Sequence, residues 1–583
     1  MLNGYDFEVF KYDWLVVIKN PIDKTKDIII NDPEKLAFIY EQKKNEIWIG
    51  YNNAHYDQYI FKGILLEMNP KKINDFIIMQ GHDGWQYSNS FKKIKMINYD
   101  VMLRNDTGLK SIEAFMGNNI KETSVPFDID RKLTEAEINE TVKYCTNDVE
   151  QTLATFIERK SEFDAALGLV KIFNLPLEYV GKTGAQRVAK ILGGMGKHFK
   201  DDEFDFPIAP TLQLKKYKIC LDWYKKPENH DYSKKQIRMI CGIPHTLAWG
   251  GLHGATGKIQ YKKDGTAYIK NEPYYGEGVF LMSDVTSYYP SLQLKYKFGY
   301  RNMGNPENFE KIHNENLRFK KAGDKKARLP YKIADNAISG QLKDPHSSLF
   351  DPRENNAVTV NGQLLLVDLL EKLEPYIEAL IQSNTDGILI KLHSIKDYDT
   401  IDDIVWEWEH RTGMRMEFDI YSKVFQKDVN NYVLVAPDGH MKTKGAYTKT
   451  LSKVDYDLPI VNKALVDFMT KNVSVEKTIY GCDDFIQFQK VIKLTGKYWA
   501  VWHNGKYTLD KCHRVFASKD SHDTYIGKCK KKGATIEKFG NTPLHCFIFD
   551  DYINGLSAPA KLDKQWYVDL AYSRLKQYGI GVT

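Results

Sequence analysis

The sequence predicts a protein of mixed α/β and α+β architecture, divided among several domains. Its 583 residues are too many for one hydrophobic core. Short apolar runs typical of buried strands occur between amphipathic stretches with a helical period. Asp284 follows one such run, VFLM, and Asp386 lies between the apolar halves of LIQSNTDGILI, a predicted strand–turn–strand hairpin.

Composition leaves open a nucleic-acid partner. The formal charge is +6, from 82 basic and 76 acidic residues, which is compatible with a polyanionic ligand. Seven cysteines without a C-x-x-C pair argue against a disulfide scaffold or zinc ribbon and favour a reducing compartment. The sequence has neither a signal peptide nor a membrane-spanning run, so we expect a soluble cytoplasmic protein with no membrane partner.

Acidic residues near the start of the chain form a first candidate site. Asp6 and Glu8 are two apart in a predicted strand and therefore share one of its faces, although surface strands often alternate acids as well. The predicted strand Ile47–Ile49 leads through Asn52 to Asp57 at the start of a helix, where an acid also suits the helix dipole of any protein.

A predicted helix carries the next two candidates. In LTEAEINETVKYCTNDVEQTLATF, Thr134 and Glu137 have the spacing of a capping box. Tyr144 and Asp148 are four residues apart, so they lie on one face of this helix.

This series resembles the DEDDy-type 3′–5′ exonuclease of proofreading DNA polymerases, which has an RNase H-like fold. The resemblance implies that two divalent metal ions are bound and that Tyr144 orients the attacking water. The implied metal ligands are Asp6, Glu8, Asp57 and Asp148.

Two lysines resemble residues of protein-primed phage polymerases. Lys110, in Gly108–Ser111, lies where these enzymes grip a single-stranded 3′ end, and Lys121 lies where a lysine contacts the scissile phosphate. A solvated lysine is the alternative for each. Asn52 is a further expected DNA contact, and Asp100 is a candidate supporting acid outside the main set.

Asp284 and Asp386 form a second candidate site. Two carboxylates at strand ends can bind a pair of divalent metals about 3.5–4 Å apart, the arrangement used for in-line nucleotidyl transfer. DVTSYYPSL resembles motif A of family B DNA polymerases. The resemblance implies metal ligation by Asp284 and the backbone of Val285, and nucleotide binding by Ser287, Tyr288 and Tyr289, with Tyr289 beneath the incoming sugar.

Four residues between these aspartates form one stripe if their segment is helical: Arg328, Lys332, Asn336 and Gly340. The segment resembles motif B, with Ala337 and Ser339 in place of serine and tyrosine. Arg328, Lys332 and Lys320 would neutralise a triphosphate. If Pro330 is the first helical residue, Arg328 lies just before the helix.

Three further segments resemble family B elements. Asn384-Thr385-Asp386-Gly387 corresponds to motif C, D-T-D-S, without its first aspartate. Gly250-Gly251 resembles a template-contacting Y-x-G-G/A element, with Ala248 in place of tyrosine. A hairpin that turns at Pro437–Gly439 resembles the primer-binding strand. The primer and its 3′ end would be held by Tyr432, Lys442 and Lys444.

The motif order predicts a right-hand polymerase behind the exonuclease. We expect an exonuclease domain at 1–165, a connecting helical region at 166–240, palm at 241–300, fingers at 301–340, palm again at 341–450, and thumb with the C-terminal region at 451–583. The basic run Lys528 and Lys530–Lys532 is either a phosphate contact of the thumb or a solvated loop.

The expected function is template-directed DNA synthesis with 3′–5′ proofreading by a compact family B polymerase of bacteriophage type. The expected ligands are primer–template DNA, dNTPs, a single-stranded 3′ end, and two Mg²⁺ ions per active site, with Mn²⁺ as a substitute. We expect a monomer in the host cytoplasm. Lys332 lies 48 positions after Asp284 and 54 before Asp386, which leaves little room for the insertions of terminal-protein-primed relatives.

Three alternatives remain at this point. Asn384 and Ser339 raise the possibility of an exonuclease with an inactive polymerase half. A family A polymerase would also have Arg and Lys four apart, but its His-Asp-Glu sequence is absent around Asp386. A non-catalytic DNA-binding protein would use the acids only structurally.

Overall fold

A computed structural model describes residues 1–22, 24–103, 106–120, 122–199 and 202–581 of the chain. The chain forms two compact units, each assembled from segments far apart in the sequence. The first comprises 1–183, 451–459 and 482–566, and the second comprises 184–450, 460–481 and 567–583. Both contain helices and sheets, so the architecture is mixed α/β and multidomain as expected; the finer domain bounds remain predictions.

The N-terminal part of the first unit is built on a five-stranded sheet in the order β3-β2-β1-β4-β5. β1 pairs antiparallel with β2 and parallel with β4. The strands are β1 (Leu2–Val9), β2 (Trp14–Lys19), β3 (Lys26–Ile30), β4 (Ile47–Gly50) and β5 (Ile97–Asp100).

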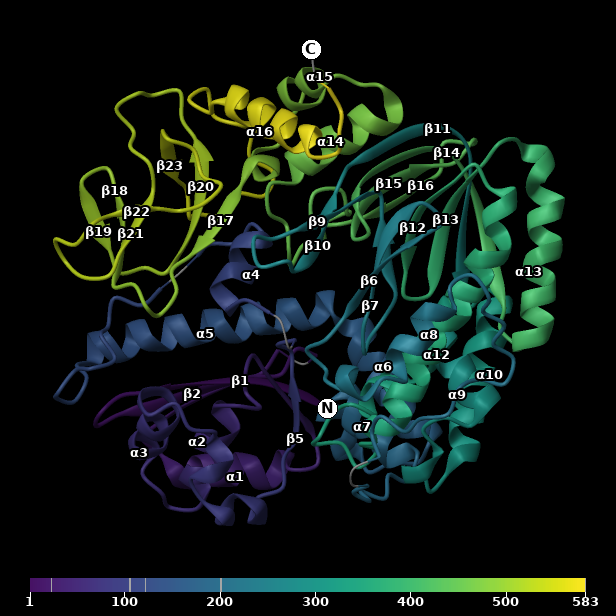
Figure 1. Cartoon of the computed structure of the whole chain (residues 1–583). Helices are drawn as coiled ribbons and strands as arrows, with labels where there is room; N and C mark the ends of the chain where they lie inside the picture. Colours follow the sequence, from purple (N-terminus) through teal and green to yellow (C-terminus); the bar gives the residue numbers. More distant parts are fainter. Residues whose placement is uncertain (23, 104–105, 121, 200–201, 582–583) are drawn as a thin grey trace. The chain divides into compact units, whose positions relative to one another are not determined.

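Helices cover both faces of this sheet, with α5 on one side and α1 to α3 on the other (Figure 1). Tyr5 and Phe7 face α1 and α2, so the alternate residues Asp6 and Glu8 face α5. Thr134 and Glu137 form the predicted capping box of α5. The helices are α1 (Pro33–Lys43), α2 (Asp57–Leu65), α3 (Pro70–Asn74), α4 (Leu109–Phe115), α5 (Glu135–Glu158) and α6 (Lys160–Ile172).

The C-terminal part of the first unit consists of two small antiparallel sheets, ordered β17-β20-β23 and β19-β18-β21-β22. Side chains from both sheets, including Val501 and Val515, share one core cluster. The strands are β17 (Lys490–Lys493), β18 (Ala500–His503), β19 (Lys506–Thr508), β20 (Cys512–Ala517), β21 (Gly527–Cys529), β22 (Glu537–Lys538) and β23 (Cys546–Ile548).

A nine-stranded sheet, ordered β16-β15-β14-β11-β13-β12-β8-β7-β6, forms the centre of the second unit. Its strands are β6 (Gln236–Ile240), β7 (Ile243–Leu247), β8 (His253–Ala255), β11 (Tyr274–Val285), β12 (Ala379–Asn384), β13 (Gly387–Leu392), β14 (Met416–Asp428), β15 (Asn431–Val435) and β16 (Met441–Lys444). A separate ribbon pairs β9 (Gly257–Tyr261) with β10 (Ala267–Asn271). The predicted hairpins at Asp386 and at Pro437–Gly439 are confirmed.

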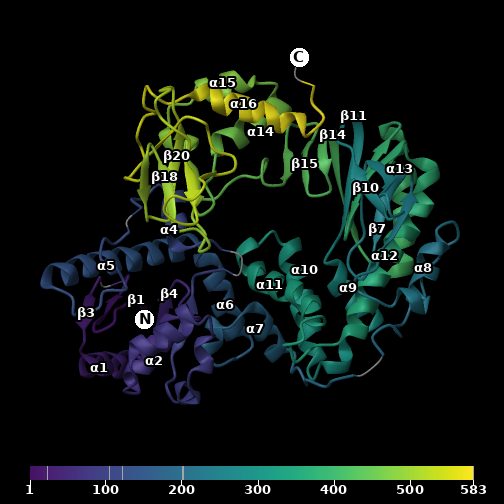
Figure 2. The same ribbon diagram turned by 60° about the vertical axis from the view of Figure 1, so that its left-hand side comes forward.

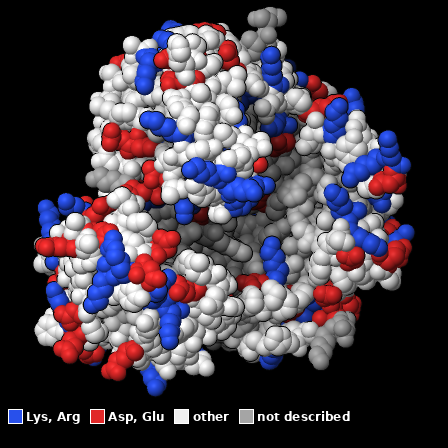
Figure 3. Space-filling view, turned by 90° about the vertical axis from the view of Figure 1, so that its left-hand side faces the viewer, with Lys and Arg blue, Asp and Glu red and all other residues white. Residues whose placement is uncertain are grey.

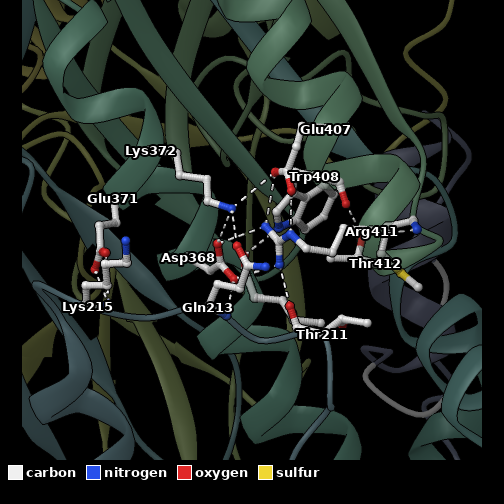
Figure 4. Close-up of polar contacts among 12 residues, drawn as sticks. Thr211, Gln213, Lys215, Asp368, Glu371, Lys372, Glu407, Trp408, Arg411 and Thr412 are labelled. Carbon is white, nitrogen blue, oxygen red and sulfur yellow. Dashed lines mark hydrogen bonds and ion pairs between the residues drawn. The ribbon is translucent and has the colours of Figure 1, made fainter.

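α12 (Pro352–Leu373) and α13 (Tyr398–Thr412) lie on one side of this sheet (Figure 2). Arg411 of α13 and Lys372 of α12 point toward the carboxylate of Asp368, which is fully buried (Figure 4). The same carboxylate accepts a hydrogen bond of 2.7 Å from the backbone N–H of Gln213. These contacts fix α13 and the segment around Gln213 to the helix that supports the sheet.

Among the remaining helices of the second unit, α10 and α11 pack on one another, and α11 also packs on α7. Pro330 lies inside α11 and not at its first position, because Asp324 caps the helix by accepting from the Ala327 amide. Arg328 is therefore helical, which corrects the alternative raised above.

The helices of the second unit other than α12 and α13 are α7 (Gly184–Ile191), α8 (Lys218–Tyr224), α9 (Tyr288–Tyr296), α10 (Pro306–Lys321), α11 (Lys325–Gln341) and α15 (Val475–Tyr480). Two more, α14 (Pro459–Lys471) and α16 (Lys564–Lys576), include residues of both units.

Charged residues of both signs are interspersed on the surface face shown in Figure 3, with several adjoining basic side chains near the centre of the view. That face therefore mixes acids and bases, in keeping with the small net charge of the sequence. Among the described residues, no helix combines the length and apolar character needed to cross a bilayer.

Gly181 provides a test of the packing in the first unit. A Cβ at this position would lie 1.7 Å from the backbone carbonyl oxygen of Asn98 in β5, which cannot move without disturbing the sheet. We expect Gly181→Ala to lower the free energy of unfolding by about 1–3 kcal/mol. Gly184→Ala is the control, because nothing lies within 4 Å of its added Cβ. Equal thermal unfolding of the two variants would contradict this account.

Candidate active sites

The structure brings Asp284 and Asp386 together at the ends of neighbouring strands. Asp284 in β11 lies opposite Gly387 in β13, the residue that follows Asp386. The Val285 amide also donates to the Asp386 carbonyl at 2.7 Å. A Cβ on Gly387 would lie 2.1 Å from the Asp284 carboxylate, so glycine at this position leaves room for that carboxylate.

Electrostatics make this pair suited to a hard cation. Burial, and then the charge of Asp284, raise the pKa of Asp386. One ammonium group already offsets the charge, since Lys442 Nζ lies 2.8 Å from Asp284 Oδ2. Paired carboxylate oxygens are the ligands that Mg²⁺ and Mn²⁺ prefer, and the donor set therefore fits the expected metals.

A cavity of about 380 Å³ opens beside Asp386. It is formed by α9, α10, α11 and the turn between β12 and β13. Its sequence-predicted members are Ser287, Tyr288, Tyr289, Arg328, Lys332, Asn336 and Asp386. Residues far apart in the sequence thus line one space that combines an acid, two cations and aromatic rings.

The two tyrosines of α9 differ in their surroundings. Tyr288 is buried and its hydroxyl donates to the Gly362 carbonyl at 2.7 Å. The Tyr289 ring stacks against it with 6.0 Å between centroids, and burial raises the pKa of Tyr289. A Cβ on Gly362 would approach the Tyr289 ring to 3.1 Å. The hydrogen bond and the stacking hold Tyr289 at the cavity wall.

Asn316 is a cavity residue that the sequence analysis missed. Its amide oxygen accepts from Arg328 Nε at 2.9 Å, and its amide nitrogen donates to Asp335 at 2.8 Å and to Ser287 Oγ at 3.3 Å. Asp335 is fully buried and also lies 3.1 Å from His313 Nδ1. This network orients Arg328. The role of Asn316 becomes visible only when α10 packs on α11, because the sequence of either helix alone does not show that Asn316 and Arg328 are partners.

Lys320 does not line the cavity. Its ammonium group forms an ion pair with Glu417 and lies 3.5 Å from Thr286 Oγ1. Glu417 stands opposite Asp284 in the β11–β14 pairing, so it is a third acid close to the pair. Glu417 is not among the predicted site residues, because only the strand register places it there.

Two non-glycine residues beside the cavity have left-handed backbone, Ser287 with φ 46° and Thr385 with φ 48°. This conformation is costly, above all for a β-branched residue. The Thr385 amide donates to the Leu252 carbonyl at 2.7 Å, and a Cβ on Gly251 would lie 2.5 Å from Thr385 Oγ1. Gly251 therefore packs directly against the turn that carries Asp386. Gly250 and Gly340 have no such close neighbour, since nothing lies within 4 Å of a Cβ added to either.

The β15–β16 hairpin contributes residues predicted to bind primer. Lys442 and Lys444 are two residues apart in β16, so their side chains share a face. Their positive charges partly oppose the rise in the pKa of Asp386 that burial and Asp284 cause. Tyr432 is only 4% exposed and packs in a core cluster with Phe280. The contacts of these residues with DNA remain predictions.

The first unit assembles the other predicted acids. Asp6 and Glu8 of β1 face α5, which carries Asp148, and Asp57 Oδ1 accepts from the Phe7 amide at 3.1 Å. Burial and the neighbouring carboxylates raise the pKa of Asp6 and of Glu8. The pKa of Asp57 is raised to about 7, mainly by burial. The repulsion among the neighbouring carboxylates favours binding of a cation between them. Their oxygen donors fit Mg²⁺.

Lys110 lies within this acid cluster. Its ammonium group forms an ion pair with Asp148, lies 3.1 Å from Glu113 Oε1, and stands 4.6 Å from the centre of the Tyr144 ring. Glu113, whose side chain is fully buried, is an acid that the sequence analysis missed. It also missed Cys145, which follows Tyr144; the donor atoms of Asp6, Glu8 and Cys145 lie within 4.8 Å of one another.

The other predicted residues of this site have different surroundings. Asp100 accepts from the amides of Asn52, Ala54 and Met102, so it fixes the loop after β4. Asn52 has a φ of 63°, and its own amide makes one of these bonds. Lys121 lies outside the described residues.

Comparison with known proteins gives structural likenesses but no sequence match. No protein-family model matches the chain, and no curated protein matches it. A family B DNA polymerase from the hyperthermophilic archaeon Pyrobaculum calidifontis is 14% identical, with a TM-score of 0.42. The match covers 100% of this chain and 78% of that one. A likeness at this level does not by itself assign a fold or an activity.

Asn316→Ala tests the network at the cavity. The change removes the Asn316 acceptor of Arg328 and one of the partners of the fully buried Asp335, which costs about 1–3 kcal/mol. If the cavity binds a nucleotide, the KM for that nucleotide should rise by about tenfold or more. Glu315→Ala is the matched control on α10, because Glu315 pairs with the exposed Arg318. Similar KM values for both variants would refute the role of Asn316.

The raised pKa of Asp57 predicts a pH-dependent stability in the absence of metal. Unfolding restores the ordinary pKa of about 3.9, so the folded protein holds an extra proton between that value and about 7. Stability from this group is full below about pH 4 and is lost as the pH rises through 7. The melting temperature of metal-free wild type should therefore fall more from pH 5 to pH 8 than that of Asp57→Asn. Parallel curves would contradict this prediction.

Proposed function

We propose that the chain is a template-directed DNA polymerase that adds dNTPs to a primer 3′ end and carries a 3′–5′ proofreading exonuclease. The cavity beside Asp386 carries the proposal. Asp386 lines it together with Arg328, Lys332 and Tyr289, and Asp284 lies opposite Gly387, the residue after Asp386. These are the residue types that a deoxynucleoside triphosphate requires. The resemblance of these segments to family B motifs supports the same activity.

In this proposal, Arg328 and Lys332 bind the triphosphate and stabilise the negative charge of the leaving pyrophosphate. Ser287 contacts a phosphate oxygen. Tyr289, held by stacking on Tyr288, lies beneath the sugar and collides with a 2′-hydroxyl, which selects deoxynucleotides. Asp284 and Asp386 would hold two Mg²⁺ ions, which when bound supply Lewis-acid stabilisation of the reacting oxygens.

The acid cluster of the first unit is proposed to be the exonuclease site. Asp6, Glu8, Asp57 and Asp148 would hold the metal ions, and Tyr144 would orient the attacking water. Lys110 is placed to offset part of the cluster's charge and to contact the phosphate of a bound 3′ end, because its ammonium group already lies among these acids.

We further propose a family B enzyme of bacteriophage type that acts as a monomer on an ordinary nucleic-acid primer. The 54 positions from Lys332 to Asp386 are occupied by the end of α11, by α12 and by β12, with their connections. No additional subdomain lies between these described elements, which supports priming without a terminal protein.

An exonuclease with an inactive polymerase half is the second candidate. Asn384 motivates it, because that residue stands where motif C carries its first aspartate. The Asn384 amide oxygen instead lies 3.0 Å from His253 Nδ1, a contact that ties β12 to β8. Asn384 thus has a structural partner, and the proposed metal ligands of the polymerase are Asp284 and Asp386 without it.

A labelled primer–template separates the two activities. With Mg²⁺ and dNTPs, the wild type should extend the primer, and Asp386→Asn should lower extension by about 10²–10³-fold while leaving excision intact. Asp148→Asn should lower excision by a similar factor and leave extension intact. Excision without any extension by the wild type would favour the second candidate, and the absence of both activities would refute the proposal.

A further inference from the structure

The position of α4 decides where Lys110 lies. α4 spans only Leu109–Phe115, and its N-terminal residue Gly108 offers no side-chain cap. A helix of two turns is marginal by itself in water. Its position relative to Asp148 and Tyr144 must therefore come from contacts with other parts of the first unit.

Arg514 of β20 bonds to the end of α4 and to the segment that follows it. Its side chain is completely buried, and its guanidinium donates to the Ala114 carbonyl at 3.1 Å and to the Asn118 carbonyl at 2.8 Å. The last carbonyls of a helix have no partner within the helix, and a cation there also suits the helix dipole. Arg514 thus binds the C-terminal end of α4 directly.

The Arg514 guanidinium also bonds within its own part of the unit. Nε donates to the Phe549 carbonyl at 3.1 Å, and Nη2, which also bonds to Asn118, lies 2.9 and 2.6 Å from the Asp550 and Asp551 carbonyls. A buried cation is costly unless all its donors are bonded. The acceptors Ala114 and Phe549 lie 400 and 35 positions from Arg514 in the sequence. The guanidinium therefore bonds two separate segments, and undocking of α4 would leave part of this buried cation without its acceptors.

Further bonds fasten the same stretch. The Asn554 side chain donates to the Met116 carbonyl at 2.9 Å, and the Ile553 amide donates to the Gly117 carbonyl at 3.0 Å. Cys512 packs with Ala114, and its thiol lies 3.5 Å from the Lys110 carbonyl. The C-terminal segment that was expected to grip duplex DNA therefore holds the helix that carries Lys110.

We propose that Arg514 is a positioning residue for the exonuclease site. By fixing the C-terminal end of α4, it keeps the Lys110 ammonium group on Asp148 and over the Tyr144 ring. This inference rests on the proposed exonuclease function. It adds that residues 482–566 control excision through α4, in addition to any contact that they make with DNA.

The test compares excision of single-stranded DNA with primer extension in the same full-length protein. Arg514→Met should lower the kcat of excision by about tenfold to a hundredfold, because small misplacements of active-site groups have effects of this size. Primer extension should change less than twofold. Ser518→Ala, which breaks a bond to Asp523 just after β20 without touching α4, should leave both activities unchanged.

A double-mutant cycle with Lys110→Met isolates the positioning role. If Arg514 acts through Lys110, Arg514→Met should add little to the loss already caused by Lys110→Met. Full multiplication of the two losses, or wild-type excision by Arg514→Met, would overturn the proposal.

Milder variants keep the test decisive if Arg514→Met fails to fold. Arg514→Lys and Asn554→Ala each remove only part of the α4 contacts, and both should lower excision and speed amide hydrogen exchange in residues 109–118. Normal excision in both would also overturn the proposal. A wild type that extends primers but never excises would refute the exonuclease itself, so the two failures are distinguishable.

Discussion

Carboxylates that repel one another can be kept together only by backbone that cannot relax. In the first unit, β1 holds Asp6 and Glu8 between β2 and β4, and the Phe7 amide fixes Asp57. In the second unit, Asp284 is the second-last residue of β11, a central strand between β13 and β14. The apolar residues that alternate with these acids are buried against helices, so burial of the cores opposes the electrostatic cost.

Each acid site also contains a lysine that is paired with one of its aspartates and offsets part of the charge. Lys110 pairs with Asp148, and Lys442 pairs with Asp284. Both lysines were expected to contact DNA. An ammonium group already held among acids has its position fixed before a phosphate arrives, so less side-chain freedom is lost on binding. The same lysines can thus serve the folded protein and the bound substrate.

The nucleotide cavity depends on a buried polar network and on strained backbone. Asn316 and Asp335 orient Arg328, while left-handed Ser287 and Thr385 place the start of α9 and the turn that carries Asp386. Buried polar groups of this kind are costly unless every bond is made. The buried polar network and the left-handed residues occur around the same cavity, and this combination distinguishes the region from an ordinary helix–sheet junction.

Local patterns in the sequence determined the elements that carry chemistry. The capping box at Thr134, the hairpin at Asp386 and the four-residue spacing from Arg328 to Asn336 depend on neighbours in the chain, and each is found in the structure. The partners of Lys320 and Arg328, and the clamp of Arg514 on α4, depend on residues distant in the sequence or on another helix. Periodicity specifies which face a side chain occupies but not what packs against that face. Only the tertiary structure decided those contacts, because they are set by how separate elements bury their surfaces together.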